Sequence, residues 1–202
     1  MISQLYGGGG NSAAPLRNDF IELFNSGTTT VNLAGWSVQY SSASGSTWAV
    51  TALPQLSLVP GQHCLIQQAS SGSNGVALPA ADAIGTIGMA ATAGKVALVR
   101  TSTALAGSCP VSGDIVDFVG YGTNASCFRG IARAPAPGNS TAIIRAGNGC
   151  SDTQNNASDF AVGPPVPRNS SVLPNVCSPG ITTSRQELWM ILFDLWYQKN
   201  II

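Results

Sequence analysis

Short runs in which apolar and polar residues alternate recur along most of this chain, and clusters of Gly, Pro, Asn and Ser separate them. Clear examples are residues 94–101 (GKVALVRT) and 114–122 (DIVDFVGYG). Successive side chains of a β-strand point to opposite faces, so a period of two is typical of strands with one buried face. No convincing amphipathic helical pattern occurs before residue 184. The chain is therefore expected to be all-β.

About eight strands follow from these runs, and they are expected to pair antiparallel. Parallel strands need long crossover connections, usually helices, and the sequence offers none. Antiparallel strands at this spacing are typical of a β-sandwich. A hairpin loop at residues 42–46 (SASGS) would place Trp36 and Trp48 on facing strands. The expected strands span residues 19–25, 31–42, 46–53, 56–68, 83–90, 94–101, 114–122 and 139–147.

Five cysteines stand at positions 64, 109, 127, 150 and 177, and their spacing matches no zinc signature. Cys64 lies in a strand-like run and is expected to be a buried thiol. The other four lie in loop-like sequence, which favours two disulfides. Nearest-neighbour pairing would join Cys109 to Cys127 and Cys150 to Cys177, although the sequence leaves the connectivity open and five reduced thiols are the alternative. Residues 146–180 are then expected to wrap the surface as a long loop clamped by cysteines.

Disulfides would place the chain in an oxidising, extracellular compartment. Since no leader follows Met1, we expect that a leader was removed or that the chain is a piece of a longer protein. Nine basic residues balance nine acidic ones, and only 9% of residues are charged. Attraction of nucleic acid at long range needs an excess of positive charge, so any contact with nucleic acid is expected to be weak.

Four consecutive glycines, residues 7–10, raise the question of a phosphate-binding loop. Such a loop follows a strand and opens a helix, so that backbone N–H groups converge on the anion. Here the glycines lead into the strand at 19–25, and no Lys-Ser or Lys-Thr pair follows them. We expect a flexible connection between a first strand at residues 2–6 and the strand at 19–25, with no cofactor bound.

Catalytic groups are not expected. His63 is the only histidine, and it neighbours Cys64 on a strand, so the two side chains should point to opposite faces. His63 is expected to be exposed or half-exposed. Asp114 and Asp117 should also face opposite sides, which argues against a general acid–base pair. Glu22 is expected to accept hydrogen bonds from an arginine or a loop backbone. The sequence therefore predicts a protein that is not an enzyme.

Oxygen-rich side chains in CSDTQNNASDF (150–160) are weak calcium candidates, although a hydrogen-bonded turn is the favoured interpretation. Four arginines could contact a ligand as a modest anion-binding patch, with surface ion pairing as the favoured alternative. Exposed aromatic residues such as Tyr40 or Tyr121 are further candidates for contact. The calcium candidates are Asp152, Asn155, Asn156 and Asp159, and the arginines are Arg129, Arg133, Arg145 and Arg168.

Several motifs occur in an order that resembles the lamin tail domain, in particular its bacterial secreted form. They are residues 2–40 (beginning ISQLYGGGGN), LVPGQHCLIQ, GKVALVR, DIVDFVGYG, CSDTQNNASDF and PPVPRNSS, and the similarity covers about residues 2–178. The resemblance implies an immunoglobulin-like β-sandwich without known catalytic machinery. It also implies a binding module that positions a partner protein, an enzyme or a surface ligand, as a monomeric domain within a larger protein. Fold likeness alone does not supply the ligand.

Two other functions stay open: an accessory domain of a secreted nuclease or phosphoesterase, and a carbohydrate-binding module. The domain is expected to span residues 1–180. Residues 181–202 change character, and their apolar stretch LWMILFDLWY is too short to span a bilayer. Ser184 and Glu187 could form the capping box of a short helix there. This tail could be an artefactual end, an interfacial anchor or a helix packed on the sandwich.

Overall fold

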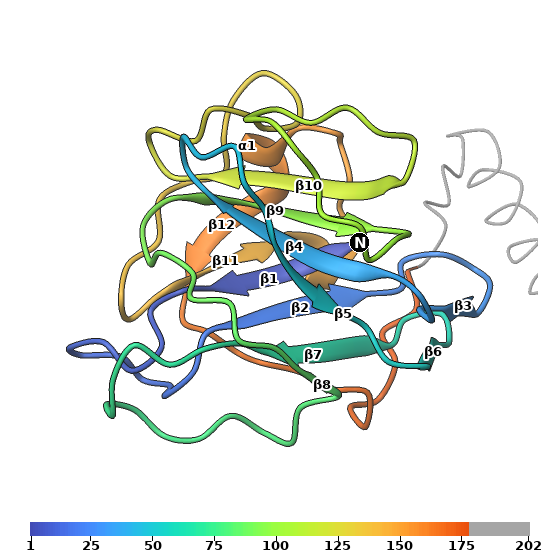
Figure 1. The fold of residues 1–202 in the computed structure, drawn as a ribbon. Coiled ribbons are helices and arrows are strands. Elements are labelled where there is room, and N and C mark those ends of the chain that lie inside the picture. Colours follow the sequence, from blue (N-terminus) through green and yellow to red (C-terminus); the bar gives the residue numbers. More distant parts are fainter. Residues whose placement is uncertain (178–202) are drawn as a thin grey trace, which may run out of the picture.

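The computed structural model describes residues 1–177, and their regular structure is nearly all β. Three sheets are present among these residues (Figure 1). The six-stranded sheet has the order β12 (Phe160–Gly163), β11 (Ala142–Arg145), β1 (Ile2–Tyr6), β2 (Phe20–Phe24), β7 (His63–Gln67), β8 (Ala83–Ile84). The four-stranded sheet has the order β10 (Ile115–Tyr121), β9 (Gly94–Val99), β4 (Ser37–Ser42), β5 (Ala49–Ala52). The smallest sheet pairs β3 (Val31–Asn32) with β6 (Ser57–Leu58).

The two larger sheets pack face to face around one apolar core. The six-stranded sheet supplies Leu5, Ile21, Leu23, Cys64, Ile66 and Ile143, and the four-stranded sheet supplies Val38, Tyr40, Val96, Leu98, Val119 and Tyr121. Alternate residues of each strand enter this core, as the period of two requires. The predicted immunoglobulin-like antiparallel β-sandwich is therefore confirmed. One pair departs from the prediction, because β7 and β8 run parallel.

Loops cover the outer faces of both large sheets. Outside the six-stranded sheet, Tyr6, Phe20 and Leu65 form a second apolar cluster. Outside the four-stranded sheet, Trp48 and Phe118 form a third, with ring centroids 5.8 Å apart. Strands β1 and β2 are consequently buried on both faces. A strand buried on both faces accounts for the dense apolar run at residues 19–25.

The glycine segment is the clearest correction to the sequence-based expectation. Gly7 to Gly10 are all buried, and a Cβ atom on Gly9 would lie 2.2 Å from the carbonyl carbon of Asn18. A Cβ on Gly8 would lie 2.5 Å from the oxygen of Asn139. These residues are therefore close-packed against backbone rather than an open, flexible connection. Glycine is required there because another chain segment occupies the space of a side chain.

Several elements differ in extent from those expected. Residues 146–177 are not loop throughout, since they contain η1 (Gly147–Gly149), α1 (Asn156–Asp159) and the edge strand β12. The expected strand at 83–90 is reduced to Ala83–Ile84. Trp36 packs against the main core, whereas Trp48 lies in the cluster outside the four-stranded sheet. The two tryptophans are thus on opposite faces, because the register pairs Gln39 with Val50. The predicted tail, residues 181–202, lies outside the described residues.

Candidate functional site

His63 and Cys64 lie on opposite faces of β7. Cys64 enters the main core, where burial raises the pKa of its thiol to about 12. His63 is buried on the outer face against Phe24, with ring centroids 4.7 Å apart, so the expectation of an exposed histidine was wrong. Burial, together with the charge of Arg168, lowers the His63 pKa to about 4. Within residues 1–177 neither ring nitrogen has a hydrogen-bond partner, and no acid is placed to orient the ring as a base.

Asp117 is the centre of a buried ionic network that the sequence did not reveal. Its Oδ1 accepts hydrogen bonds from Arg129 Nη1 at 2.8 Å and from the Phe118 N–H at 2.8 Å. Its Oδ2 accepts hydrogen bonds from Arg145 Nη2 at 2.7 Å and from the Ile2 N–H at 2.8 Å. The Arg145 side chain is only 1% exposed and also pairs with Asp159 at 3.5 Å. Both carboxylate oxygens of Asp117 are therefore occupied by structural partners.

The four predicted contact arginines do not form one patch. Arg129 and Arg145 share Asp117. Arg168 lies on the outer face of the six-stranded sheet, where its Nη2 pairs with Glu22 Oε1 at 2.8 Å. The backbone N–H of Arg168 donates to Glu22 Oε2 at 2.7 Å. Arg133 donates to the Ala125 carbonyl and lies over the Phe128 ring. Three of the four arginines have a carboxylate partner, but each of these carboxylates is buried, so the pairs are not the surface ion pairs that were expected.

The four calcium candidates are likewise engaged in hydrogen bonds, and two of them are linked, since the Asn155 backbone N–H donates to Asp159 Oδ2. Asn156 is buried and completes the edge of β10, since its Oδ1 accepts the Gly120 N–H and its Nδ2 donates to the Phe118 carbonyl. Asp159 accepts the Thr153 N–H, and Asp152 accepts hydrogen bonds from Gln154. The Asn155 amide nitrogen donates to Ser158. In residues 1–177 no group of three or more His, Cys, Asp or Glu side chains could hold a metal ion.

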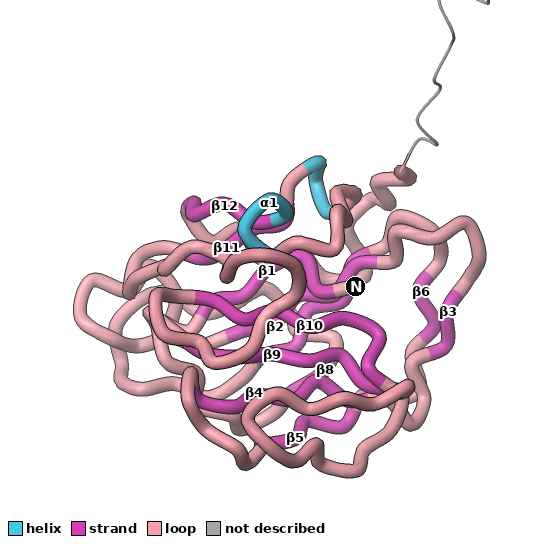
Figure 2. Tube along the Cα trace, turned by 90° about the horizontal axis from the view of Figure 1, so that it is seen from above, coloured by secondary structure: helices cyan, strands magenta, loops and turns pink. Residues whose placement is uncertain are grey.

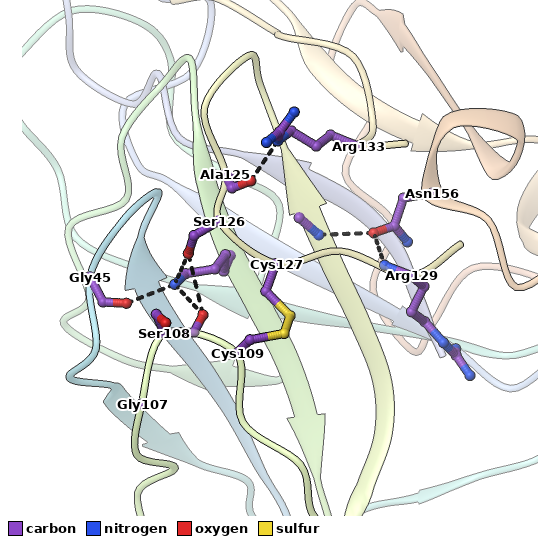
Figure 3. Close-up of a disulfide and its surroundings, with 12 residues drawn as sticks. Gly45, Gly107, Ser108, Cys109, Ala125, Ser126, Cys127, Arg129, Arg133 and Asn156 are labelled. Atoms are coloured by element: carbon purple, nitrogen blue, oxygen red, sulfur yellow. Dashed lines mark hydrogen bonds between the residues drawn. A yellow bond between two sulfur atoms is a disulfide. The ribbon is translucent and has the colours of Figure 1, made fainter. Parts of the chain in front are cut away.

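Both predicted disulfides, Cys109–Cys127 and Cys150–Cys177, are present. Figure 3 shows the first of them beside Gly45, Ser108 and Ser126. The buried Lys95 ammonium donates to the carbonyl oxygens of Gly45 and Ser108, each at 2.7 Å, and to Ser126 Oγ at 3.0 Å. Lys95 thus joins three loops around the disulfide, and its charge is satisfied by neutral oxygens and by the Trp48 ring.

The predicted aromatic contacts are not available at the surface. Tyr40 and Tyr121 are 8% and 2% exposed, and both hydroxyl groups bond to the backbone of Ala90. No aromatic side chain in the described part of the chain is among its exposed large hydrophobic residues. A flat row of exposed rings, the usual basis of sugar binding, is therefore not formed by residues 1–177.

A cleft of about 270 Å³ opens at one end of the sandwich, beside the small β3–β6 sheet. Figure 2 shows β3 and β6 side by side at that end, close to the N-terminus. The cleft walls come from both large sheets and from the small one, and they are apolar: Leu23, Val31, Leu33, Leu58, Leu98 and Val116. A larger hollow of about 360 Å³ beside Thr47 and Thr86 has no charged side chain in its lining. The apolar cleft is therefore the best candidate for a binding site.

Charged side chains stand at the rim of this cleft. Arg129 and Asp152 are partly exposed there, and the buried Asp117 lines the cleft beneath them. Asp152 joins the network of Asp117 through Arg145, at 3.8 Å. Arg100 is exposed, and its guanidinium lies 5.6 Å from the centre of the half-buried Trp36 ring. An apolar interior with a polar rim is the usual anatomy of a small interaction site.

A family model for the lamin tail domain matches residues 1–123. This chain belongs to the lamin tail domain family. The comparisons with curated proteins and with solved structures gave no match. No helix among residues 1–177 is long and apolar enough to cross a membrane.

The matched part of this lamin tail domain contains most of the cleft lining, including Trp36, Arg100 and Val116. Arg129 and Asp152 come from outside it. Sequence reasoning missed the cleft because its walls come from strands far apart in the chain. One signal was available for the ionic network: an aspartate, Asp117, lies within a strongly apolar strand, and a buried charge there requires a partner.

Proposed function

We propose that this lamin tail domain is a non-catalytic, extracellular interaction module that holds a partner protein through the cleft at the end of its sandwich. The observation that carries the proposal is the cleft itself, an apolar space between the sheets with charged side chains at its mouth. Buried apolar pockets of this kind receive the anchoring side chains that dominate protein–protein affinity.

Two further features support the proposal. The only histidine and the free thiol are buried and lack activating partners among the described residues, so neither is suited to nucleophilic or general-base chemistry. The two disulfides favour an oxidising compartment, since cytosolic thiols are kept reduced.

The test is a selection of displayed random peptides on the natural chain, followed by binding to two variants. Val31→Asp puts a charge on the cleft wall, whereas Val111→Asp changes a side chain that is 99% exposed and outside the cleft. We expect enriched peptides to carry a large apolar residue, to lose at least about tenfold in affinity for Val31→Asp and to bind Val111→Asp normally. Equal binding to both variants, or no enrichment, would contradict the proposal.

A further inference from the structure

The size of the cleft limits what it can enclose. Its volume of about 270 Å³ lies below the roughly 300–1,000 Å³ of pockets that bury a drug-sized molecule or a cofactor. One large apolar side chain is a better match for this space. The rest of such a ligand would remain outside, against the rim.

Arg100 is the rim group with hydrogen-bonding capacity to spare. Its only side-chain hydrogen bond within residues 1–177 runs from Nη1 to the Gly113 carbonyl at 3.4 Å. No carboxylate of the described residues lies within ion-pair distance of it, whereas Arg129, Arg145 and Arg168 all have one. Two acids line the same cleft: Asp117 has both oxygens occupied, and Asp152 pairs with Arg145 at 3.8 Å and accepts a hydrogen bond from Gln154. The unneutralised charge at the mouth is therefore positive.

We propose that the partner segment is an acidic peptide, in which a large apolar side chain enters the cleft and a neighbouring carboxylate pairs with Arg100. This inference rests on the proposed function and specifies the chemistry of its ligand. Stacking on Trp36 holds the guanidinium at the rim, so less side-chain freedom is lost when the carboxylate binds. A segment of a partner protein supplies both groups within two or three residues.

Short peptides test this chemistry directly. The probe is the acetylated and amidated pentapeptide QELWM, the sequence of residues 186–190, and its comparison peptides are QQLWM and QESSS. Calorimetric titration at low salt measures their affinity for the full natural chain, for Arg100→Gln and for Arg17→Gln. Arg17 is an exposed arginine outside the cleft and serves as the matched control.

We expect the natural chain and Arg17→Gln to bind QELWM about fivefold more tightly than QQLWM, and Arg100→Gln to bind the two equally. The preference should shrink in 0.5 M salt, because the rim is open to solvent. QESSS, which keeps the carboxylate but has no apolar side chain, should not bind. If QELWM and QQLWM bind the natural chain equally, the acidic ligand is refuted and the apolar cleft stands. Tighter binding of dodecanoate than of QELWM would overturn the peptide assignment.

The sequence itself contains Glu187-Leu188-Trp189 and Asp194-Leu195-Trp196, outside the described residues. The titration is therefore repeated on the full chain with Leu188, Trp189, Leu195 and Trp196 changed to serine. Tighter binding of QELWM than of QQLWM, to the natural chain or to the four-serine variant, supports the inference. If QELWM binds the four-serine variant more tightly than the natural chain, residues 188–196 of the chain compete with the peptide. If no peptide binds either form, the inference and the proposed function both fail.

Discussion

Asp117, Arg145 and Glu22 are among the least exposed side chains of the protein, and each has a partner of opposite charge. A buried charge is tolerated only when ion pairs and hydrogen bonds replace its water. Asp117 meets this condition with four hydrogen bonds that reach β1, β11 and the segment after β10. These three buried charges therefore serve to connect strands and loops of the described part of the chain.

Asp117→Asn should lower the free energy of unfolding by about 3–5 kcal/mol, because it leaves the Arg145 guanidinium buried without its closest counter-charge. Urea unfolding followed by tryptophan fluorescence measures the loss. The control is Asp114→Asn, an exposed aspartate in the same segment, which should stay within about 0.5 kcal/mol of the natural chain. Equal stability of the two variants would show that the network is not a stabilising feature.

Asp19 and His63 should give the fold opposite pH dependences. Burial raises the pKa of Asp19 from 3.8 to about 6, although the hydrogen bonds from the Met89 and Gly9 N–H groups act in the opposite direction and lower it. Its contribution to stability is therefore complete below pH 3.8 and is lost as the pH rises towards 6. Burial, reinforced by Arg168, lowers the His63 pKa from 6.5 to about 4. Its contribution is complete above pH 6.5 and is lost as the pH falls towards 4.

The difference in stability between each variant and the natural chain should isolate the contribution of the replaced residue. From pH 4 to pH 6.5, the free energy of unfolding of His63→Leu, relative to the natural chain, should fall by up to about 3 kcal/mol. That of Asp19→Asn should rise by up to about 3 kcal/mol over pH 4 to 6. Urea unfolding at four pH values gives both difference profiles. Two flat profiles would mean that neither group has the shifted pKa.

At the scale of elements, two loop segments are held close to the backbone of the six-stranded sheet. The glycine segment 7–10 brings the Gly9 N–H to within 2.8 Å of Asp19 Oδ1.

On the outer face of the six-stranded sheet, residues 164–177 form a strap. Gln4 exchanges two hydrogen bonds of 2.8 Å with the Val166 backbone, and Glu22 pairs with Arg168. The Cys150–Cys177 disulfide closes the end of this strap.

Gly9→Ala should destabilise the protein by about 3 kcal/mol, because the added methyl group meets backbone atoms that cannot move independently. Gly113→Ala is the matched control, since nothing lies within 4 Å of its added Cβ. Its stability should change by less than about 0.5 kcal/mol. Thermal unfolding compares the two, and a Gly9→Ala protein as stable as the control would disprove the close packing of this segment.

Loss of the strap disulfide in the double variant Cys150→Ser/Cys177→Ser should cost about 3–4 kcal/mol, the value for a loop of 27 residues. Hydrogen exchange should increase first in residues 164–177, because the remaining contacts of the strap are mainly hydrogen bonds with the sheet. The double variant Cys109→Ser/Cys127→Ser is the comparison, and its exchange should increase around Ser108 and Ser126 instead. The same exchange pattern in both variants would contradict the separate roles of the two disulfides.

Periodicity predicted β4 and β9 well, although both of their faces are buried, because the core residues of these strands alternate with mostly polar or small ones. It failed where the cause of order was tertiary. The glycine segment was expected to be flexible, because the sequence does not show that Asn18, Asn139 and Gly72 pack against it. Strand β12 was missed because it has only four residues, which are followed by a Pro-rich stretch, and four residues are too few to show a clear alternation. The candidate site could not be predicted at all, since Val31, Leu98 and Val116 meet only in the folded chain.

At the scale of the whole molecule, the two sheets close over a continuous core, and the end beside β3 and β6 keeps an open apolar space. Ion pairs and hydrogen bonds engage most of the charged side chains within the fold. Arg100 differs, because it stands at the cleft without a carboxylate among residues 1–177. This combination is what the proposed interaction module requires.

Whether the cleft between the sheets binds the ligand can be mapped residue by residue, from the amide chemical shifts of the isotope-labelled full chain titrated with QELWM. The largest amide shift changes should fall on the cleft walls, at Val31, Leu98, Arg100 and Val116. The outer faces, reported by Glu22 and Ala97, should change little. Changes concentrated on either outer face, with the cleft walls unaffected, would show that the peptide does not bind in the cleft.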